Sequence, residues 1–295
     1  LILHQTNGRI NNIKCQFYLY CTMSISTNFL LFINYKTIKS MKSMKNLFAI
    51  GLTLVICAGF TACGNDDDKQ EVTLPTIFEG KRITQCESTA NGYTERNAYS
   101  YSNGKLISYS EYEISNKETI EDKYTIDYEN NQVRISWKDG NDSEICTYSL
   151  NENGFATSAI LVTKEDEDVW NTHYTFEYDA NGYLIQITEG NDGEEPEIIE
   201  IERNDGDVLS FSYDDSQYTY TYTSNINKGG ILPVDNGWLN MEAELHIAYY
   251  AGILGKPTKH LIASQKDKFG YRSNEETYEY ELDADKYVKS CTITD

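Results

Sequence analysis

The residue types that could carry chemistry are sparse and scattered in this chain. Its acidic part, residues 63–295, holds three histidines, His173, His246 and His260, and none lies within metal-ligand spacing of another. There is no Cys-x-x-Cys pair, and no cysteine has a histidine nearby, so zinc binding and thiol catalysis both lack their residues. We therefore expect structural or surface histidines, no catalytic residue, no metal and no cofactor.

Carboxylates are the abundant ionisable groups. With 46 of them, an acid–base pair is easy to imagine, and a carboxylate-dependent glycan hydrolase is one alternative function. Proximity along so acidic a sequence selects no particular pair. Oxygen-rich segments at 139–144 and 204–207 offer calcium ligands, but neither matches the twelve-residue calcium-loop pattern, and ordinary β-turns are expected there.

A row of alternating Tyr and Thr, containing Tyr218, Tyr220 and Tyr222, is the most suggestive binding feature. Every second side chain of a strand points to the same face, so the three rings share one face over roughly 13 Å. Burying a Tyr hydroxyl without a partner costs roughly 1–3 kcal/mol, which argues for water or a ligand nearby. We take the three tyrosines as the candidate binding face, with a role in the core as the alternative.

Charge excludes one class of partner. Residues 63–295 contain all 46 acidic residues and 19 of the 25 basic ones, a net charge of −27. A chain this acidic is repelled by phosphate backbones, so we expect no binding to nucleic acid. The same residues contain 21 Tyr and three Trp, which supplement a low content of aliphatic side chains. They predict an ordered domain with a wet, tyrosine-rich core.

Strand–turn–strand units position these residues. Asn-Gly, a strong hairpin signal that suits the positive φ angles of type I′ turns, recurs between runs in which large apolar residues alternate with polar ones. Such units need neighbours to bury their apolar face, and consecutive hairpins pair in order. The pattern predicts an all-β fold, an antiparallel β-meander sheet built from repeated hairpins. The Asn-Gly pairs stand at 91–92, 103–104, 153–154, 181–182 and 236–237, with related turns at 130–131 and 204–206.

One segment breaks this pattern. Trp238, Leu245 and Tyr249 fall at helical spacing, which predicts one short helix near 237–254, packed on the sheet. Gly255 is expected to end the helix, and a proline two residues later blocks its continuation.

The N-terminal part has the organisation of an export signal. Residues 1–40 contain no acidic residue and are expected to be upstream translation, with the true start at Met41 or Met44. Basic residues follow, and then a 14-residue apolar run, Leu47–Phe60. This run is too short for a membrane-spanning helix, which needs roughly 20 residues, and suits a signal peptide over 41–62.

The residues before Cys63 resemble the lipobox of bacterial lipoproteins, although Phe60 replaces the commoner leucine. The resemblance implies that Cys63 is acylated and attaches the chain to a membrane. The acidic tether over 63–75 resembles the export signal of surface lipoproteins of the Bacteroides group, which implies exposure at the outer-membrane surface; the periplasmic face is the alternative. The remaining Cys86, Cys146 and Cys291 allow at most one disulfide.

Repeated Tyr-x-Tyr-x-x-Asn-Gly-x-Leu units, together with the later stretch 251–261, resemble the family of envelope lipoproteins known as domain of unknown function 4595. The resemblance covers roughly 76–295 and implies an antiparallel β-sheet domain without established catalytic residues. We therefore expect a lipid-anchored cell-envelope protein that is a non-catalytic binding module for a glycan or a protein partner. A glycan hydrolase and a purely structural envelope component are the alternatives.

Overall fold

The computed structural model describes residues 13–16, 74–75, 77–78, 80–90, 93–115, 118–213, 216–232, 243–269 and 272–294. They belong to one compact unit, formed by residues 1–21 and 70–295. Cys63 and the signal-peptide segment lie outside the described residues, so the expected domain boundaries stay predictions. In the described part of the chain, no helix is long and apolar enough to cross a membrane.

The described residues form sixteen strands and one helix, α2 (Ala243–Ala251). The first eight strands are β1 (Ile13–Gln16), β2 (Gln85–Ala90), β3 (Tyr93–Ser102), β4 (Lys105–Ile114), β5 (Thr119–Glu129), β6 (Gln132–Asp139), β7 (Asp142–Leu150) and β8 (Ala156–Glu165). The others are β9 (Asp168–Tyr178), β10 (Leu184–Asn191), β11 (Glu197–Asn204), β12 (Asp207–Tyr213), β13 (Ser216–Ile226), β14 (His260–Phe269), β15 (Arg272–Leu282) and β16 (Val288–Thr294).

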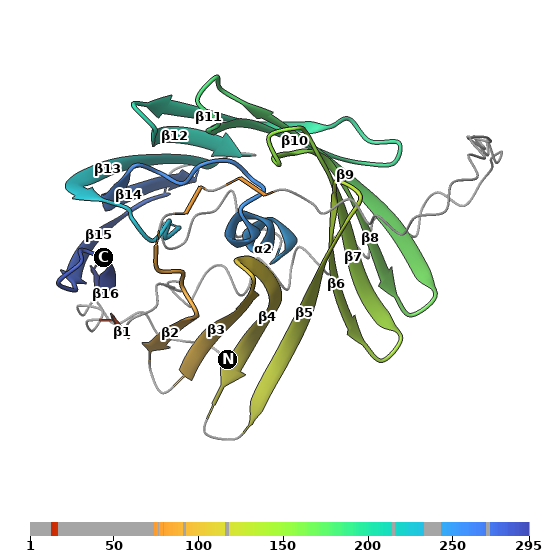
Figure 1. Ribbon diagram of the computed structural model, residues 1–295, viewed down its shortest axis with the longest axis horizontal. Coiled ribbons are helices and arrows are strands. Elements are labelled where there is room, and N and C mark those ends of the chain that lie inside the picture. The colour runs from red at the N-terminus through yellow and green to blue at the C-terminus, as the bar shows by residue number, and fades with distance from the viewer. Residues whose placement is uncertain are drawn as a thin grey trace. The chain divides into compact units, whose positions relative to one another are not determined.

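The strands follow one another in the sheet in their order along the chain. Each strand from β2 to β16 pairs antiparallel with its sequence neighbours, and β1 pairs with β16. The sheet curves around α2, which lies on its inner side (Figure 1). The expected all-β meander with a single short helix is therefore confirmed.

Because the strands alternate in direction, the connections between them lie alternately at the two ends of the strands. We call one of these ends of the sheet the helix end: it carries the turns at 103–104, 130–131, 151–155, 179–183, 205–206 and 283–287, and the connection 227–259 that contains α2. The far end carries the connections near 115–118, 140–141, 166–167 and 192–196. The far end is rich in carboxylates, including the run Glu165–Asp168.

The hairpin prediction is confirmed, but not every turn has the expected type. Asn103 and Gly104 have φ angles of 50° and 77°, as a type I′ turn requires. At 153–154 and 181–182 only the glycine has a positive φ, so the type I′ prediction is wrong there. Those two glycines instead belong to the five-residue turns 151–155 and 179–183, in which the side chain of the first residue accepts hydrogen bonds from main-chain N–H groups of the turn.

Bulges explain why the repeats use tyrosine. Near the start of β4, β8 and β12, one extra residue shifts the register with the preceding strand. A bulge interrupts the hydrogen-bond ladder, and a tyrosine hydroxyl from the following strand binds a carbonyl oxygen at each of them. These bonds join Tyr128 to Leu106, Tyr178 to Ala156 and Tyr222 to Val208, over 2.9, 2.8 and 2.8 Å.

The core lies between the inner face of the sheet and α2. Its largest fully buried side chains include Tyr148, Tyr174 and Tyr250. The Tyr109 hydroxyl donates to Asn97 Oδ1 over 2.8 Å, so a polar partner is buried beside this ring. This arrangement agrees with the expected tyrosine-rich core.

Helix α2 is buried along nearly its whole length. It ends where Gly252, at a φ of 85°, donates to the Tyr249 carbonyl oxygen, while the next residue donates to that of Ala248. The prediction that the helix reaches 254 and ends at Gly255 is therefore wrong, because the earlier glycine already provides the left-handed cap. The expected helical residues 237–242 lie outside the described part of the chain.

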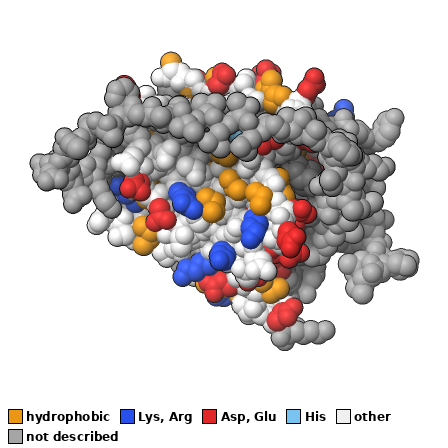
Figure 2. All heavy atoms as spheres, turned by 90° about the vertical axis from the view of Figure 1, so that its right-hand side faces the viewer, with side chains coloured by type: hydrophobic (Ala, Val, Ile, Leu, Met, Phe, Trp, Pro, Cys, Tyr) orange, Lys and Arg blue, Asp and Glu red, His pale blue; other side chains and the backbone are white. Residues whose placement is uncertain are grey.

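The outer face of the sheet is polar. Side chains of both charges and separate apolar side chains share the surface seen from the side of β8 and β9 (Figure 2). Exposed apolar residues such as Ile160 and Val169 stand at intervals along different strands. A sheet with one face on a core and the other in water has this distribution.

Candidate functional site

The helix end brings together segments that are distant in the sequence. Phe78 packs edge-on against Tyr249 of α2, with ring centroids 5.9 Å apart. The segment containing Lys81 reaches the turn between β15 and β16, about two hundred positions later in the chain. The segment before β2 and the turn between β15 and β16 therefore both lie at the helix end of the sheet.

Basic side chains at this end lie over aromatic rings. Among the described residues, every cation–ring contact is found at the helix end, in a chain with 46 carboxylates that could pair with the same cations. Such contacts stabilise both partners. The pairs are Lys81–Tyr287, Arg82–Phe78, Arg82–Tyr101, Lys105–Tyr128, Arg203–Tyr183, Lys228–Tyr287 and Lys256–Tyr183.

Three helix-end turns share one construction. In each five-residue turn, the first residue is Asn or Asp, and its side-chain oxygen accepts hydrogen bonds from the main-chain N–H groups of the third and fifth residues. The main-chain N–H of the first residue donates to the carbonyl oxygen of the fifth. The fourth residue has a positive φ, and the fifth is aromatic. The turns begin at Asn151, Asp179 and Asp283.

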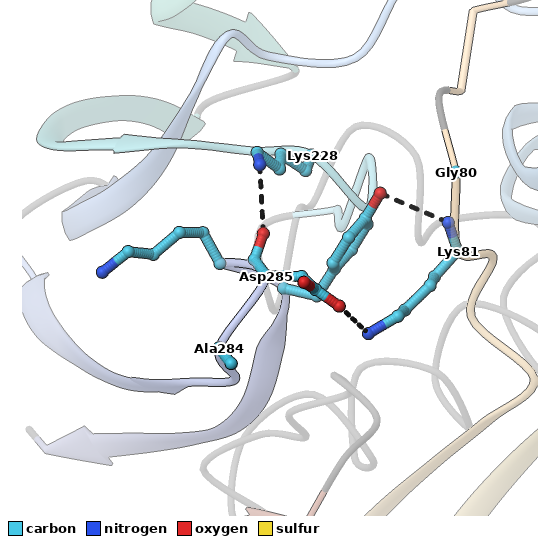
Figure 3. A pocket seen from close by; sticks show the side chains of 7 residues that line it. Gly80, Lys81, Lys228, Ala284 and Asp285 are labelled. Carbon is cyan, nitrogen blue, oxygen red and sulfur yellow. Dashed lines mark hydrogen bonds and ion pairs between the residues drawn. The ribbon is translucent and has the colours of Figure 1, made fainter.

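The last of these turns borders a surface pocket of about 620 Å³. Lys81 Nζ donates to Asp283 Oδ2 over 2.7 Å and to Asp285 Oδ2 over 2.9 Å. Lys228 Nζ donates to the Asp285 carbonyl oxygen over 3.0 Å, so two lysines from separate segments hold the turn (Figure 3). The lining residues are Gly80, Lys81, Lys228, Ala284, Asp285, Lys286 and Tyr287.

Charge pairing fixes the ionisation of this turn. The hydrogen bonds to Asp283 and then Asp285 raise the pKa of Lys81 above its ordinary value. The hydrogen bond from Lys81 in turn lowers the pKa of Asp283. Both groups therefore stay charged near neutral pH, and the pocket combines cations with acceptor oxygens.

A different group of ionisable side chains occupies the inner face of β3, β4 and β5. Glu111 is directly opposite Asp122 on the neighbouring strand. Burial, followed by the repulsion of Glu95, Asp122 and Glu113, raises the pKa of Glu111 to about 7. A carboxylic acid that keeps its proton near neutral pH, beside another carboxylate, is the arrangement that acid–base chemistry uses.

The predicted tyrosine row lies on the inner face of β13. Tyr220 is only 6% exposed, and Tyr218 and Tyr222 are partly buried against the core. The Tyr218 ring stacks on Phe211 with centroids 4.5 Å apart. The structure thus gives these rings core contacts, and contact with a ligand stays a hypothesis that unfolding experiments can test.

The three histidines lie in separate places. His246 on α2 is buried, its Nε2 is 2.9 Å from the Tyr99 hydroxyl, and burial lowers its pKa to about 3. His173 contacts Asp192 over 2.9 Å on the exposed side of the sheet. His260 contacts Asp207 over 2.7 Å. Among the described residues, no cluster of three or more His, Cys, Asp or Glu side chains has the geometry of a metal site.

The oxygen-rich turns considered for calcium are used within the fold. The Asp205 carboxylate pairs with Lys259, and Asp207 accepts the main-chain N–H of His260, which ties the turn before β12 to β14. Asp142 accepts the main-chain N–H of Asp166 over 2.8 Å. Cys86, Cys146 and Cys291 are buried thiols, so no disulfide joins any two of them.

A curved antiparallel meander that encloses one short helix defines an all-β sheet protein. The chain belongs to the family described as domain of unknown function (DUF4595) with porin-like fold, whose model matches residues 99–290. It is also similar to the crystal structure of a porin-like protein from Bacteroides uniformis ATCC 8492 at 2.32 Å resolution. That match has 26% sequence identity and a TM-score of 0.55, and covers 74% of this chain and 86% of that one. No curated protein matches the chain.

Sequence reasoning missed the pocket around Tyr287. The segment 278–288 has the strand–turn–strand pattern with Lys286 in the place of the turn glycine, and this lysine was the available signal. Lys81 and Lys228 gave no such signal, because only the folded sheet brings them to this turn.

Proposed function

We propose that this chain is a lipid-anchored protein of the cell envelope that binds a glycan through its helix end and catalyses no reaction. The observation that carries the proposal is the collection of lysines over aromatic rings at one end of an acidic domain. Cations held at a surface favour an anionic partner, and the acidic remainder of the domain repels it. An acidic glycan therefore fits better than a neutral one.

The carboxylates at the helix end support binding over hydrolysis. A glycosidase needs one carboxylic acid that stays protonated until it donates its proton. The Lys81 hydrogen bond lowers the pKa of Asp283, and that of Lys259 lowers the pKa of Asp205. These carboxylates remain ionised and hold lysines in place, which suits a binding surface.

A binding titration tests the proposal. The unacylated mature chain is titrated calorimetrically with oligogalacturonate, a glycan that carries carboxylates, and with neutral dextran as the matched control. We expect binding of the acidic glycan only, and weaker binding at higher salt because exposed charges are screened. Equal affinity for dextran, or no binding to oligogalacturonate, would contradict a helix end that recognises acidic glycans.

Glu111 favours the second candidate, a glycan hydrolase. Its raised pKa and its place opposite Asp122 would suit a general acid beside a second carboxyl group. In that case incubation with the glycan would release new reducing ends, and Glu111→Gln would abolish the release while leaving binding intact. Under the binding proposal, the wild-type chain releases none.

A further inference from the structure

Lys286 stands at a turn position that glycine occupies in the two other turns of the same construction. The hydrogen-bond patterns are the same, and the φ angles are 78° at Gly154, 85° at Gly182 and 69° at Lys286. Glycine adopts this left-handed conformation readily, whereas a residue with a Cβ is strained there. A glycine at position 286 would therefore suit the backbone better than the lysine does.

The other left-handed residues show how unusual this lysine is. The remaining non-glycine residues with positive φ in the described part of the chain are all Asn or Asp, whose short polar side chains tolerate the conformation. Lys286 has a long aliphatic side chain and no such compensation. Strained residues cluster at functional sites, so the side chain itself is the feature to explain.

Lys286 is the third lysine among the residues that line the pocket around Tyr287. Lys81 is engaged by Asp283 and Asp285, and Lys228 is engaged by the Asp285 carbonyl oxygen. Within the described residues, the Lys286 ammonium group has neither an ion pair nor a hydrogen bond. It is the cation of this pocket that remains available to a ligand.

The lining indicates which kind of anion would fit. The pocket is an open surface depression with a volume of about 620 Å³, which leaves room for a sugar ring at the protein surface. The ammonium groups match a carboxylate, while the Asp285 carboxylate and the Tyr287 hydroxyl are able to accept hydrogen bonds from sugar hydroxyls. A pocket for a bare phosphate would need donors alone.

We propose that the pocket around Tyr287 binds an acidic sugar residue of a glycan, and that Lys286 is kept at the glycine position because its ammonium group contacts the sugar carboxylate. This inference rests on the proposed glycan-binding function and assigns it to one site. It predicts that binding and stability respond in opposite directions to a single substitution.

That substitution is Lys286→Gly in the unacylated mature chain, with oligogalacturonate as the probe. Loss of a charge-assisted hydrogen bond should weaken binding roughly ten- to hundredfold. The urea midpoint should stay the same or rise, because glycine relieves the strain. Lys138→Ala is the matched control, since it removes one exposed positive charge from β6 near the far end, outside this pocket, and its affinity should stay close to that of the wild type.

The outcomes separate the two proposals. If the wild-type chain does not bind the glycan, the proposed function fails. If it binds and Lys286→Gly binds equally well, or if Lys138→Ala loses as much affinity, the assignment to this pocket is overturned while glycan binding stands. If Lys286 instead supports binding to phosphatidylglycerol vesicles and the soluble glycan does not compete, the ligand class is wrong and the surface docks on lipid.

Discussion

The hydroxyl of Tyr222 on β13 donates a hydrogen bond to the carbonyl oxygen of Val208 on β12 over 2.8 Å. Tyr178 and Tyr128 make the equivalent bond four and eight strands earlier in the sheet, each at a bulge on the preceding strand. Tyr222 is therefore part of the repeating framework as well as of the candidate binding face. This bond gives a structural reason for tyrosine where a strand would otherwise accept an aliphatic residue.

Tyr222→Phe should lower the free energy of unfolding by about 1–2 kcal/mol, because it leaves a carbonyl oxygen without its partner. Tyr220→Ala should cost about 3–5 kcal/mol, as expected for a buried aromatic ring. Urea unfolding measures both, with the exposed Gln217→Ala as control. A loss below about 1 kcal/mol for Ala at each of the three tyrosines would instead indicate an open face.

Gly80→Ala should displace the Tyr287 ring. A Cβ atom at Gly80 would lie 2.1 Å from the Tyr287 hydroxyl oxygen, and the residue has a φ of 80°. We expect a loss of stability of about 1–3 kcal/mol in urea unfolding and weaker glycan binding. Gly104→Ala is the matched control: its φ is 77°, but a Cβ there has no heavy atom within 4 Å, so it isolates the backbone strain. Equal stability losses in the two variants would show that the Tyr287 ring moves away from the new Cβ atom without a measurable cost.

The pH dependence of stability should report Glu111. Its pKa of about 7 in the folded chain is above the ordinary value of 4.5, so the folded state binds this proton more tightly than the unfolded state does. The resulting stabilisation is complete below about pH 4.5 and is lost as the pH rises to about 7. Glu111→Gln should match the wild type at pH 4 and exceed it by about 2–3 kcal/mol at pH 8.

Glu129→Gln on β5 is the control for this measurement, because it removes an exposed carboxylate that lies outside the group around Glu111. His246 contributes in the opposite sense: its lowered pKa means that stability is lost as the pH falls from about 6.5 towards 3. The two slopes oppose each other between about pH 4.5 and 6.5, so only the difference between variant and wild type isolates Glu111. A difference that does not change with pH would reject the raised pKa.

The lipid anchor is testable in cells. Cys63→Ala should abolish incorporation of labelled palmitate and release the chain from the membrane fraction, because the thiol that receives the acyl group is absent. Cys86→Ala serves as the control, since this buried cysteine lies in the sheet. Unchanged labelling of Cys63→Ala would reject the lipoprotein assignment.

Turn chemistry made most of the fold predictable. Asn-Gly and related pairs are local signals, and the hairpins at 103–104 and 130–131 have the positive φ angles that these residues favour. The bulges were not predictable, because an extra residue in a strand has no distinctive composition. The C-terminus of α2 was misplaced because two glycines were available, and the main-chain hydrogen bonds that end the helix use the earlier one, Gly252.

The candidate site was less accessible to sequence reasoning. The tyrosine row was visible as a pattern, but alternation alone does not tell which face of a strand is covered. The pocket depends on Lys81 and Lys228, which reach Asp283 and Asp285 only through long-range pairing of the chain. Lys286 was visible in the sequence, yet its meaning depended on the φ angle of a turn.

The meander also determines the order in which the molecule can be assembled during synthesis. Each strand from β3 onward finds its partner in the strand made just before it, so loop closure is short and hairpins can form one after another. Helix α2 fills the inner side of the sheet, yet it is made only after β13. Until then the inner faces of the early hairpins lack their covering helix and are exposed to water. Tyrosine rings, whose hydroxyl water can solvate, suit this temporary exposure better than aliphatic side chains would.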